Sequence, residues 1–281
     1  MEKPIKNILI PMNFSNSCDQ AVNTGIAMCN RHGATLHLLE IKRAQRFVYP
    51  TGKSAELIGM RLESHMEDLK FMELYAGQIS TENSIDCFYH LEDGAFAKTV
   101  AVVAVDFYCD LIILQQEHEE SLYVSFKHIS AAEIIKETKC PVMTLPRNNF
   151  SKDFKSISFP VWATKSLYGK LEMSLSIIKK NDSKVILLGA LKTKDDPWEL
   201  NMVDKLADSL LALISLTTNN VEKELDHSPG TAKKILKRAS NNGSDLLVIS
   251  SSLNRGIKSV FVPTYTEQII KNATIPVLSV K

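Results

Sequence analysis

Apolar and polar residues recur along the chain in two kinds of segment, short apolar runs and longer amphipathic stretches. The short runs, such as VILLGA at 185–190 and DLLVIS at 245–250, are continuous in Val, Ile and Leu, which is typical of parallel strands buried on both faces. The longer stretches repeat apolar residues every three or four positions, as helices packed on a sheet do. The pattern predicts an α/β fold with parallel sheets.

The predicted elements form two sets, each of five strands and four helices. The first set has strands at 7–12, 34–41, 85–90, 110–114 and 141–145, and helices at 17–32, 54–78, 94–107 and 130–138. The second has strands at 156–161, 184–190, 221–226, 245–249 and 276–280, and helices at 167–180, 197–216, 230–241 and 264–272. With 147–153 as linker, we expect one domain at 1–146 and a second at 154–281.

The two sets also match each other in spacing. Asp110 opens the run DLIIL and Pro141 follows 31 residues later, while Asp245 opens DLLVI and Pro276 follows after the same interval. Each set begins with an apolar strand that carries a proline near its end, in NILIPM and SISFPV. An internal repeat of this length indicates a tandem duplication.

Charge and composition exclude several classes of protein. Lys and Arg number 33 and Asp and Glu 32, so the net charge of +1 gives no bulk attraction to nucleic acid or membranes. The charge is uneven, with a net −5 in residues 1–150 and +6 in 151–281. The first residues do not resemble a secretory signal, and the apolar stretch 95–114 contains three charged residues, so we expect a cytoplasmic protein.

Reactive and metal-binding patterns are not recognisable. The five cysteines lie in the first half without a Cys-x2-Cys pair, which favours reduced thiols, with Cys109 in the core, over disulfides or a zinc site. The motifs of serine hydrolases, P-loop enzymes, zinc proteases and dinucleotide-binding enzymes do not occur. We therefore expect no enzyme, no catalytic residues and no metal.

Several segments together resemble the universal stress protein family, in two tandem copies. The resemblance lies in KNILIPMNFSNSCDQAVNTGIAMCNRHGATLHLLEI, in DLIIL and DLLVI, and in the closing CPVMTLP and IPVLSVK. It implies two tandem five-stranded parallel α/β sandwich domains, Rossmann-like and of the adenine-nucleotide alpha-hydrolase-like type. It also implies that Pro141–Leu145 and Pro276–Val280 pair the two domains within one chain, and it leaves open a homodimer and an unknown protein partner.

Many members of this family bind ATP through a loop of the form Gly-x2-Gly-x9-Gly-Ser/Thr after the fourth strand, where glycines let backbone amides surround the phosphates. The corresponding positions of the first copy hold Gln115, His118, His128 and Ile129. A shift of one residue brings in Ser130 but no glycine. The same loop carries Glu117, Glu119 and Glu120. Each close contact of these acids with a phosphate would cost roughly 1 to 4 kcal/mol, so we expect no ATP in this copy.

The second copy departs less completely from the family's loop. Its glycine positions hold Ser250, Leu253 and Pro263, its hydroxyl position holds Thr264, and Gly256 matches a further family glycine. Arg255 and Lys258 make the loop cationic, whereas Pro263 removes a backbone N–H. The candidate ligands of a nucleotide or small anion are therefore Ser250, Arg255, Gly256 and Thr264. We expect no cofactor, and ATP is disfavoured although not excluded in this copy.

Several of these residues also have structural interpretations. Thr264 with Glu267, and Ser130 with Glu133, fit a helix capping box, which is the favoured interpretation. Where the family often has an acid near the nucleotide, this chain has Asn13 and Trp162, and the indole would either fill the base's space or stack on a base. The helix at 230–241 carries a basic face formed by Lys233, Lys234, Lys237 and Arg238. That face is a solvated surface or a contact for an acidic partner.

The sequence as a whole predicts a non-catalytic regulatory or binding protein of stress adaptation with degenerate ATP-binding loops. One alternative is a second copy that binds a nucleotide or small anion. A further alternative is slow nucleotide hydrolysis or an unrecognised transferase activity, for which the sequence names no base and no metal ligand.

Overall fold

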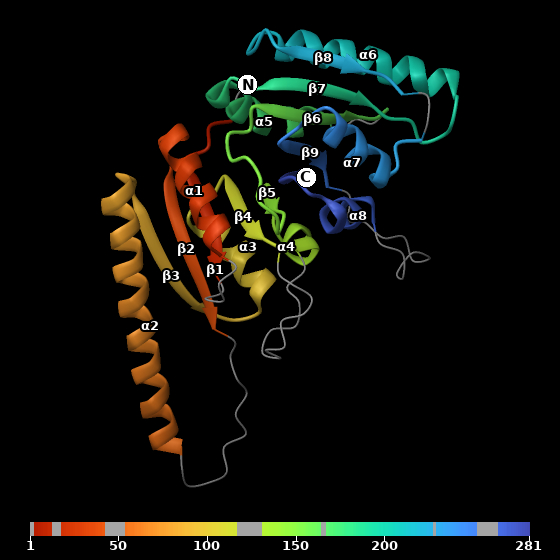
Figure 1. Ribbon diagram of the computed structural model, residues 1–281. Helices are drawn as coiled ribbons and strands as arrows, with labels where there is room; N and C mark the ends of the chain where they lie inside the picture. The colour runs from red at the N-terminus through yellow and green to blue at the C-terminus, as the bar shows by residue number, and fades with distance from the viewer. Residues whose placement is uncertain are drawn as a thin grey trace.

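The computed structural model describes residues 3–12, 18–42, 54–116, 131–163, 167–226, 229–251 and 264–281, without the side chains of 54–65, 68, 167 and 168. Strands and helices alternate throughout (Figure 1). The first half contains β1 (Asn7–Met12), α1 (Asp19–His32), β2 (Thr35–Lys42), α2 (Ser54–Asn83), β3 (Cys87–Asp93), α3 (Phe96–Asp106), β4 (Leu111–Gln115), α4 (Ala131–Glu137) and β5 (Val142–Leu145). The second half contains β6 (Ser156–Val161), α5 (Leu167–Asn181), β7 (Lys184–Gly189), α6 (Pro197–Ile214), β8 (Val221–Glu224), α7 (Ala232–Asn241), β9 (Leu246–Ser250), α8 (Tyr265–Asn272) and β10 (Val277–Val280).

The ten strands form one sheet in the order β3-β2-β1-β4-β5-β10-β9-β6-β7-β8. Strand neighbours within each half are parallel. The halves meet where β5 pairs antiparallel with β10, with Leu278 opposite Met143. The α/β class with parallel sheets and alternating helices is confirmed, and the two five-stranded sheets are continuous with each other. The domain limits at 146 and 154 remain a prediction.

Helices cover both faces of the sheet and bury an apolar core on each. One face carries α1, α2, α5 and α6 over the largest cluster, which extends from Ile8 in β1 to Val280 in β10. The other face carries α3 and α4 over a cluster that includes Leu9 and Ile112, and α7 and α8 over a cluster that includes Leu247 and Ile249. Because successive side chains of a strand point to opposite faces of the sheet, each buried strand packs against helices on both faces.

Two hydrogen bonds join the halves at related positions. Gln116, just after β4, donates from Nε2 to the carbonyl of Ile270 in α8 at 2.6 Å. Lys281, just after β10, donates from Nζ to the carbonyl of Lys136 in α4 at 2.8 Å. In each half, the residue that follows a central strand thus donates a side-chain hydrogen bond to the last helix of the other half.

Arg31, in the last turn of α1, makes a further connection between the halves. Its guanidinium donates to Oδ1 of Asn181 at 2.7 Å and to the carbonyl of Lys152 at 2.5 Å. The same group lies 5.6 Å from the ring centroid of Phe154. Planar guanidinium groups suit such combined hydrogen bonding and stacking, so Arg31 fixes the linker segment against both halves.

The structure differs from the sequence prediction mainly around the end of α2. The helix continues to Asn83, five residues past the predicted end at 78, and β3 begins at Cys87, two residues later than predicted. Side-chain bonds continue the helix, since Gln78 donates to Glu82 at 2.8 Å and Asn83 to the carbonyl of Ile79 at 2.9 Å. The helix ends where Ser84 has a φ of 54°, a conformation that breaks a right-handed helix.

All five cysteines are free thiols. Cys109 is 8% exposed, which confirms its predicted place in the core, and burial raises the pKa of its thiol to about 12. Among the described residues, no helix combines the length and the apolar character needed to cross a membrane.

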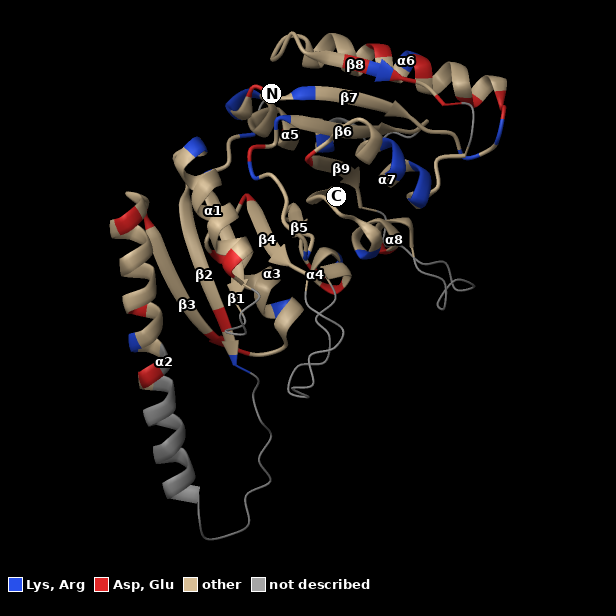
Figure 2. Ribbon diagram, in the orientation of Figure 1, with Lys and Arg blue, Asp and Glu red and all other residues tan. Residues whose placement is uncertain are grey.

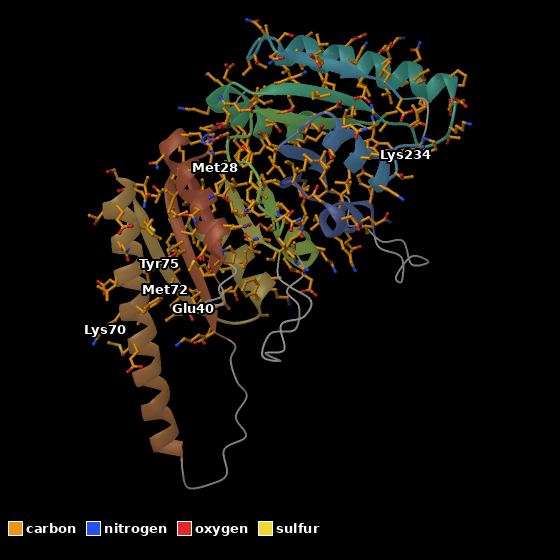
Figure 3. The ribbon with its side chains drawn as sticks, in the orientation of Figure 1. Met28, Glu40, Lys70, Met72, Tyr75 and Lys234 are labelled. Atoms are coloured by element: carbon orange, nitrogen blue, oxygen red, sulfur yellow. The ribbon has the colours of Figure 1, made fainter. Side chains whose placement is uncertain are left out.

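On α2, Lys70 points away from the sheet while Met72 and Tyr75 lie on the side that faces it (Figure 3).

Candidate functional site

In a parallel α/β fold, ligands bind at the carboxyl ends of the strands, and in the first half Gln115 occupies this edge. Its Nε2 lies 3.1 Å from Oε1 of Gln20 in α1 and 3.1 Å from the carbonyl of Pro146 after β5. The side chain that replaces the first glycine of the family loop therefore ties β4 to its neighbours. The rest of this loop, with His118, His128 and the three glutamates, lies outside the described residues.

In the second half, Trp162 packs across the corresponding edge, directly after β6. A methyl group added at Gly230 would lie 2.6 Å from Cη2 of Trp162 and 2.6 Å from Cβ of Ala190, so only glycine leaves room for the indole. Trp162 also makes an edge-to-face contact with Tyr265, with ring centroids 5.6 Å apart. The indole is thus held between the starts of α7 and α8.

The backbone amides after β7 are bonded to a carboxylate of the chain itself. Oε2 of Glu199 accepts from the N–H of Lys192 at 2.9 Å and from that of Thr193 at 3.2 Å. Glu199 is 5% exposed and is positioned by the start of α6, where Asp196 caps the helix and Pro197 occupies its first turn. A pair of amides that suits an anion is therefore already satisfied.

Thr264 directly precedes α8 as its N-cap and forms the predicted capping box. Its Oγ1 accepts from the N–H of Glu267 at 3.3 Å, and Oε2 of Glu267 accepts from the N–H of Thr264 at 2.6 Å. Ser250 is the half-buried last residue of β9, and the next residue, Ser251, is bonded to the carbonyl of Val280 through its N–H at 2.7 Å. Arg255 and Gly256, like Ser130 of the other predicted capping box, lie outside the described residues.

Lys170, in α5, places a buried amine beneath the end of β6. The residue is 2% exposed, its Nζ donates to the carbonyl of Pro160 at 2.5 Å, and it lies 4.1 Å from the ring centroid of Phe159. Burial lowers the pKa of Lys170 to about 7, because a charged amine is disfavoured in apolar surroundings. The amine is therefore partly neutral at physiological pH.

The basic residues of α7 are blue in Figure 2, but the exposed basic face is smaller than the sequence predicts. Lys233, Lys234 and Lys237 are exposed. Arg238 instead turns inward, where Nε contacts Oε1 of Glu224 at 2.8 Å and Nη1 donates to the carbonyl of Gly189 at 2.7 Å. Arg238 thus fixes α7 to the sheet.

Sequence reasoning missed the side chains that close the second half's edge. Lys170 had a signal, because it lies four residues before Ser174 and seven before Ile177 on the buried stripe of α5. Gly230 can be expected to precede a helix, but the sequence around it does not indicate that it contacts Trp162, 68 positions away. Among the residues the structure describes, no three His, Cys, Asp or Glu side chains gather in a way that would hold a metal ion.

Comparison with known proteins places this architecture. The sequence profile of the universal stress protein family matches residues 4–146, whereas no curated protein matches the sequence. A universal stress protein from Archaeoglobus fulgidus shares 12% identity and a TM-score of 0.70, over 98% of this chain and 96% of that one. A functionally unknown protein from Pseudomonas aeruginosa shares 15% identity and a TM-score of 0.63, over 99% and 92%.

A third solved structure with this fold has a different context. The cytoplasmic domain of a prokaryotic cation chloride cotransporter shares 10% identity and a TM-score of 0.56, over 98% of this chain and 95% of that one. At such identities these likenesses concern the fold alone. The profile match covers half of the chain, and the duplicated pattern of strands and helices agrees with it. The chain belongs to the universal stress protein family.

Proposed function

We propose that this chain is a non-catalytic binding or regulatory member of its family, active in stress adaptation, whose two strand-end edges do not take ATP. The observation that carries the proposal is the edge of the second half. There the indole of Trp162 is packed against Gly230, and the carboxylate of Glu199 accepts from two amides after β7. A nucleotide would have to displace an aromatic ring and approach a buried anion, and both changes oppose binding.

The first half supports the same proposal through Gln115. Phosphate loops use glycine because the backbone must approach the anion closely. Gln115 instead places a side chain that bonds to Gln20 and to the carbonyl of Pro146. The end of β4 is therefore tied to α1 and to the segment after β5 by a side chain that a glycine would lack.

A family member that does not bind ATP would have to exert its regulatory effect by binding another macromolecule. We propose a cytoplasmic protein that acts through a protein partner, with its two halves associated in one chain and with homodimer formation as a further state. The uneven charge, net −5 in 1–150 and +6 in 151–281, supports electrostatic selection of such a partner.

Native mass spectrometry of the protein purified from cells, followed by calorimetric titration with ATP, tests the proposal. We expect the mass of the chain alone and no saturable heat at millimolar ATP. Phosphate release from ATP should not exceed that of a heat-inactivated sample. A co-purified nucleotide, saturable heat or turnover above the inactivated sample would contradict the proposal.

A second candidate function is binding of a nucleotide or small anion by the second half. It is supported by the bridge between Leu191 and Pro229, which brings the exposed Lys192 next to the start of α7 with its three exposed lysines. The candidate ligands are Ser250, Arg255, Gly256 and Thr264. If ATP produces saturable heat, the double variant R255A/T264A should abolish it, whereas the variant K180A, on the exposed side of α5, should not.

A further inference from the structure

A line of hydrogen-bonded residues crosses the first half of the sheet on the face covered by α3. Nδ1 of His37 in β2 lies 2.9 Å from Nε2 of His90 in β3. Nε2 of His37 lies 3.2 Å from Oδ1 of Asn7 in β1, and Nδ2 of Asn7 donates to the carbonyl of Tyr108 at 3.4 Å. We call these four residues the histidine chain. It links three neighbouring strands to the turn between α3 and β4.

The protons in the histidine chain follow from its end at Tyr108. A carbonyl only accepts, so the amide of Asn7 must present Nδ2 to Tyr108 and Oδ1 to His37. Nε2 of His37 therefore carries a proton, and because a neutral imidazole has one N–H, Nδ1 of His37 is an acceptor. Nε2 of His90 must then be the donor to His37. All three hydrogen bonds run in the same direction, from the edge strand to the turn.

The pair of histidines lies in apolar surroundings. His37 is 5% exposed, and the ring of Phe107 lies 4.0 Å from that of His90 and 5.6 Å from that of His37. Burial lowers the pKa of His37. Burial, together with the neighbouring His37, lowers the pKa of His90 to about 4. Both rings are therefore neutral at pH 7.

Titratable groups on the surrounding elements do not offset this effect. The charged ones are Lys6 before β1, Asp86 and Glu92 on either side of His90, Asp106 at the end of α3 and Asp110 before β4, and the neutral Tyr108 lies in the turn. Asp110 accepts from the N–H groups of Lys6 and Asn7 and pairs with Lys3. Among the described residues, neither imidazole contacts a carboxylate.

We propose that the histidine chain is an acid-sensitive switch, which holds β3 and the α3–β4 turn in place while the pair is neutral and releases them when both histidines take up protons. A first proton from solvent enters at Nδ1 of His90, because the other ring nitrogens are all engaged in hydrogen bonds. The resulting imidazolium still donates to His37. A second proton must go to Nδ1 of His37, and two N–H groups would then face each other across 2.9 Å. That contact has no acceptor, so the chain breaks there.

β3 lies at the edge of the described sheet, where it pairs with β2 on one side and packs against α2. Tyr108 has a φ of 49°, which non-glycine residues adopt only with support from their surroundings, and its carbonyl is the group that Asn7 holds. Phe88 and Phe107 are already 55% and 39% exposed. Release would therefore open the edge of β2 and enlarge an apolar surface beside it.

Hydrogen exchange of the full chain at pH 7 and pH 4, corrected for intrinsic exchange rates, tests the switch. The variant H90Q keeps a donor to His37 but does not titrate, and H32Q removes a histidine of α1 as a control. In the wild type and in H32Q, protection of 36–42 and 87–93 should fall by up to about 100-fold, as a pKa lowered from 6.5 to about 4 allows. In H90Q only His37 of the pair still titrates, so the fall should be smaller than in the wild type.

Two results would overturn the proposal. One is equal loss of protection in H90Q and the wild type, provided that both give the same circular dichroism at pH 7. The other is nuclear magnetic resonance of the wild type in which His37 and His90 titrate independently near the ordinary histidine pKa. Titration of both below that value, together with a larger loss of β3 protection in the wild type and in H32Q than in H90Q, would support it.

Discussion

Replacing Lys170 with methionine removes a buried amine and leaves an unbranched apolar side chain that is one atom shorter. Folding takes the amine out of water and gives it one carbonyl, that of Pro160, and the ring of Phe159. A protonated amine has three donors, so this site satisfies only part of them. We expect K170M to stabilise the second half at neutral pH.

The magnitude follows from the lowered pKa of Lys170, which is about 7 in the folded chain against an ordinary 10.5. At 1.36 kcal/mol per pKa unit, the cost of burial is about 5 kcal/mol when the amine is charged in the unfolded chain. Loss of the hydrogen bond to Pro160 and of the contact with Phe159 offsets about 2 kcal/mol. A net gain of about 3 kcal/mol at pH 7 is expected.

The same shift fixes the sign of the pH dependence. Between pH 7 and 10.5 the unfolded chain binds a proton that the folded chain does not, so wild-type stability rises with pH across this window. Below pH 7 both states hold the proton and the burial cost is constant. The advantage of K170M should therefore be greatest at pH 7 and below, and should fall by about 2 kcal/mol by pH 9.

Urea unfolding followed by tryptophan fluorescence measures this effect, because Trp162 and Trp198, the two tryptophans of the chain, both lie in the second half. Measurements at pH 6, 7, 8 and 9 would give the slope. K180M, on the exposed side of the same helix, is the matched control and should show neither a gain nor a slope. A K170M variant that is less stable than the wild type, or whose advantage does not change with pH, would refute the reasoning.

Three further substitutions test contacts of the candidate site and of the junction between the halves. G230A should lose about 1 to 3 kcal/mol in urea unfolding, because its methyl group would meet the indole of Trp162, whereas G77A, with no atom in reach, should gain up to about 1 kcal/mol. E199A should lose about 2 to 3 kcal/mol, because two amides lose their acceptor; unchanged unfolding would mean that water replaces the carboxylate. R31A should lose about 2 kcal/mol and raise hydrogen exchange around Asn181, and exchange that stays the same would exclude Arg31 as a connection between the halves.

The alternation of strands and helices could be predicted because it depends on periodicities within one segment, such as the apolar run 185–190. The capping box of Thr264 was equally accessible, since its two partners lie three residues apart. The end of α2 was missed because side-chain bonds such as that from Gln78 to Glu82 extend a helix without an apolar signal. The packing of Trp162 on Gly230 and the pairing of His37 with His90 depend on distant segments, and one sequence contains no pattern that reports such contacts.

The antiparallel pair of β5 and β10 has a consequence for how the protein behaves at low abundance. Both strands belong to one polypeptide, so their association is a unimolecular equilibrium with no dependence on protein concentration. Two separate chains joined by the same strands would dissociate on dilution below their dissociation constant. The continuous sheet of this chain therefore persists at copy numbers at which a dimer would come apart, and changes in expression alter its amount without altering its assembly across this pair of strands.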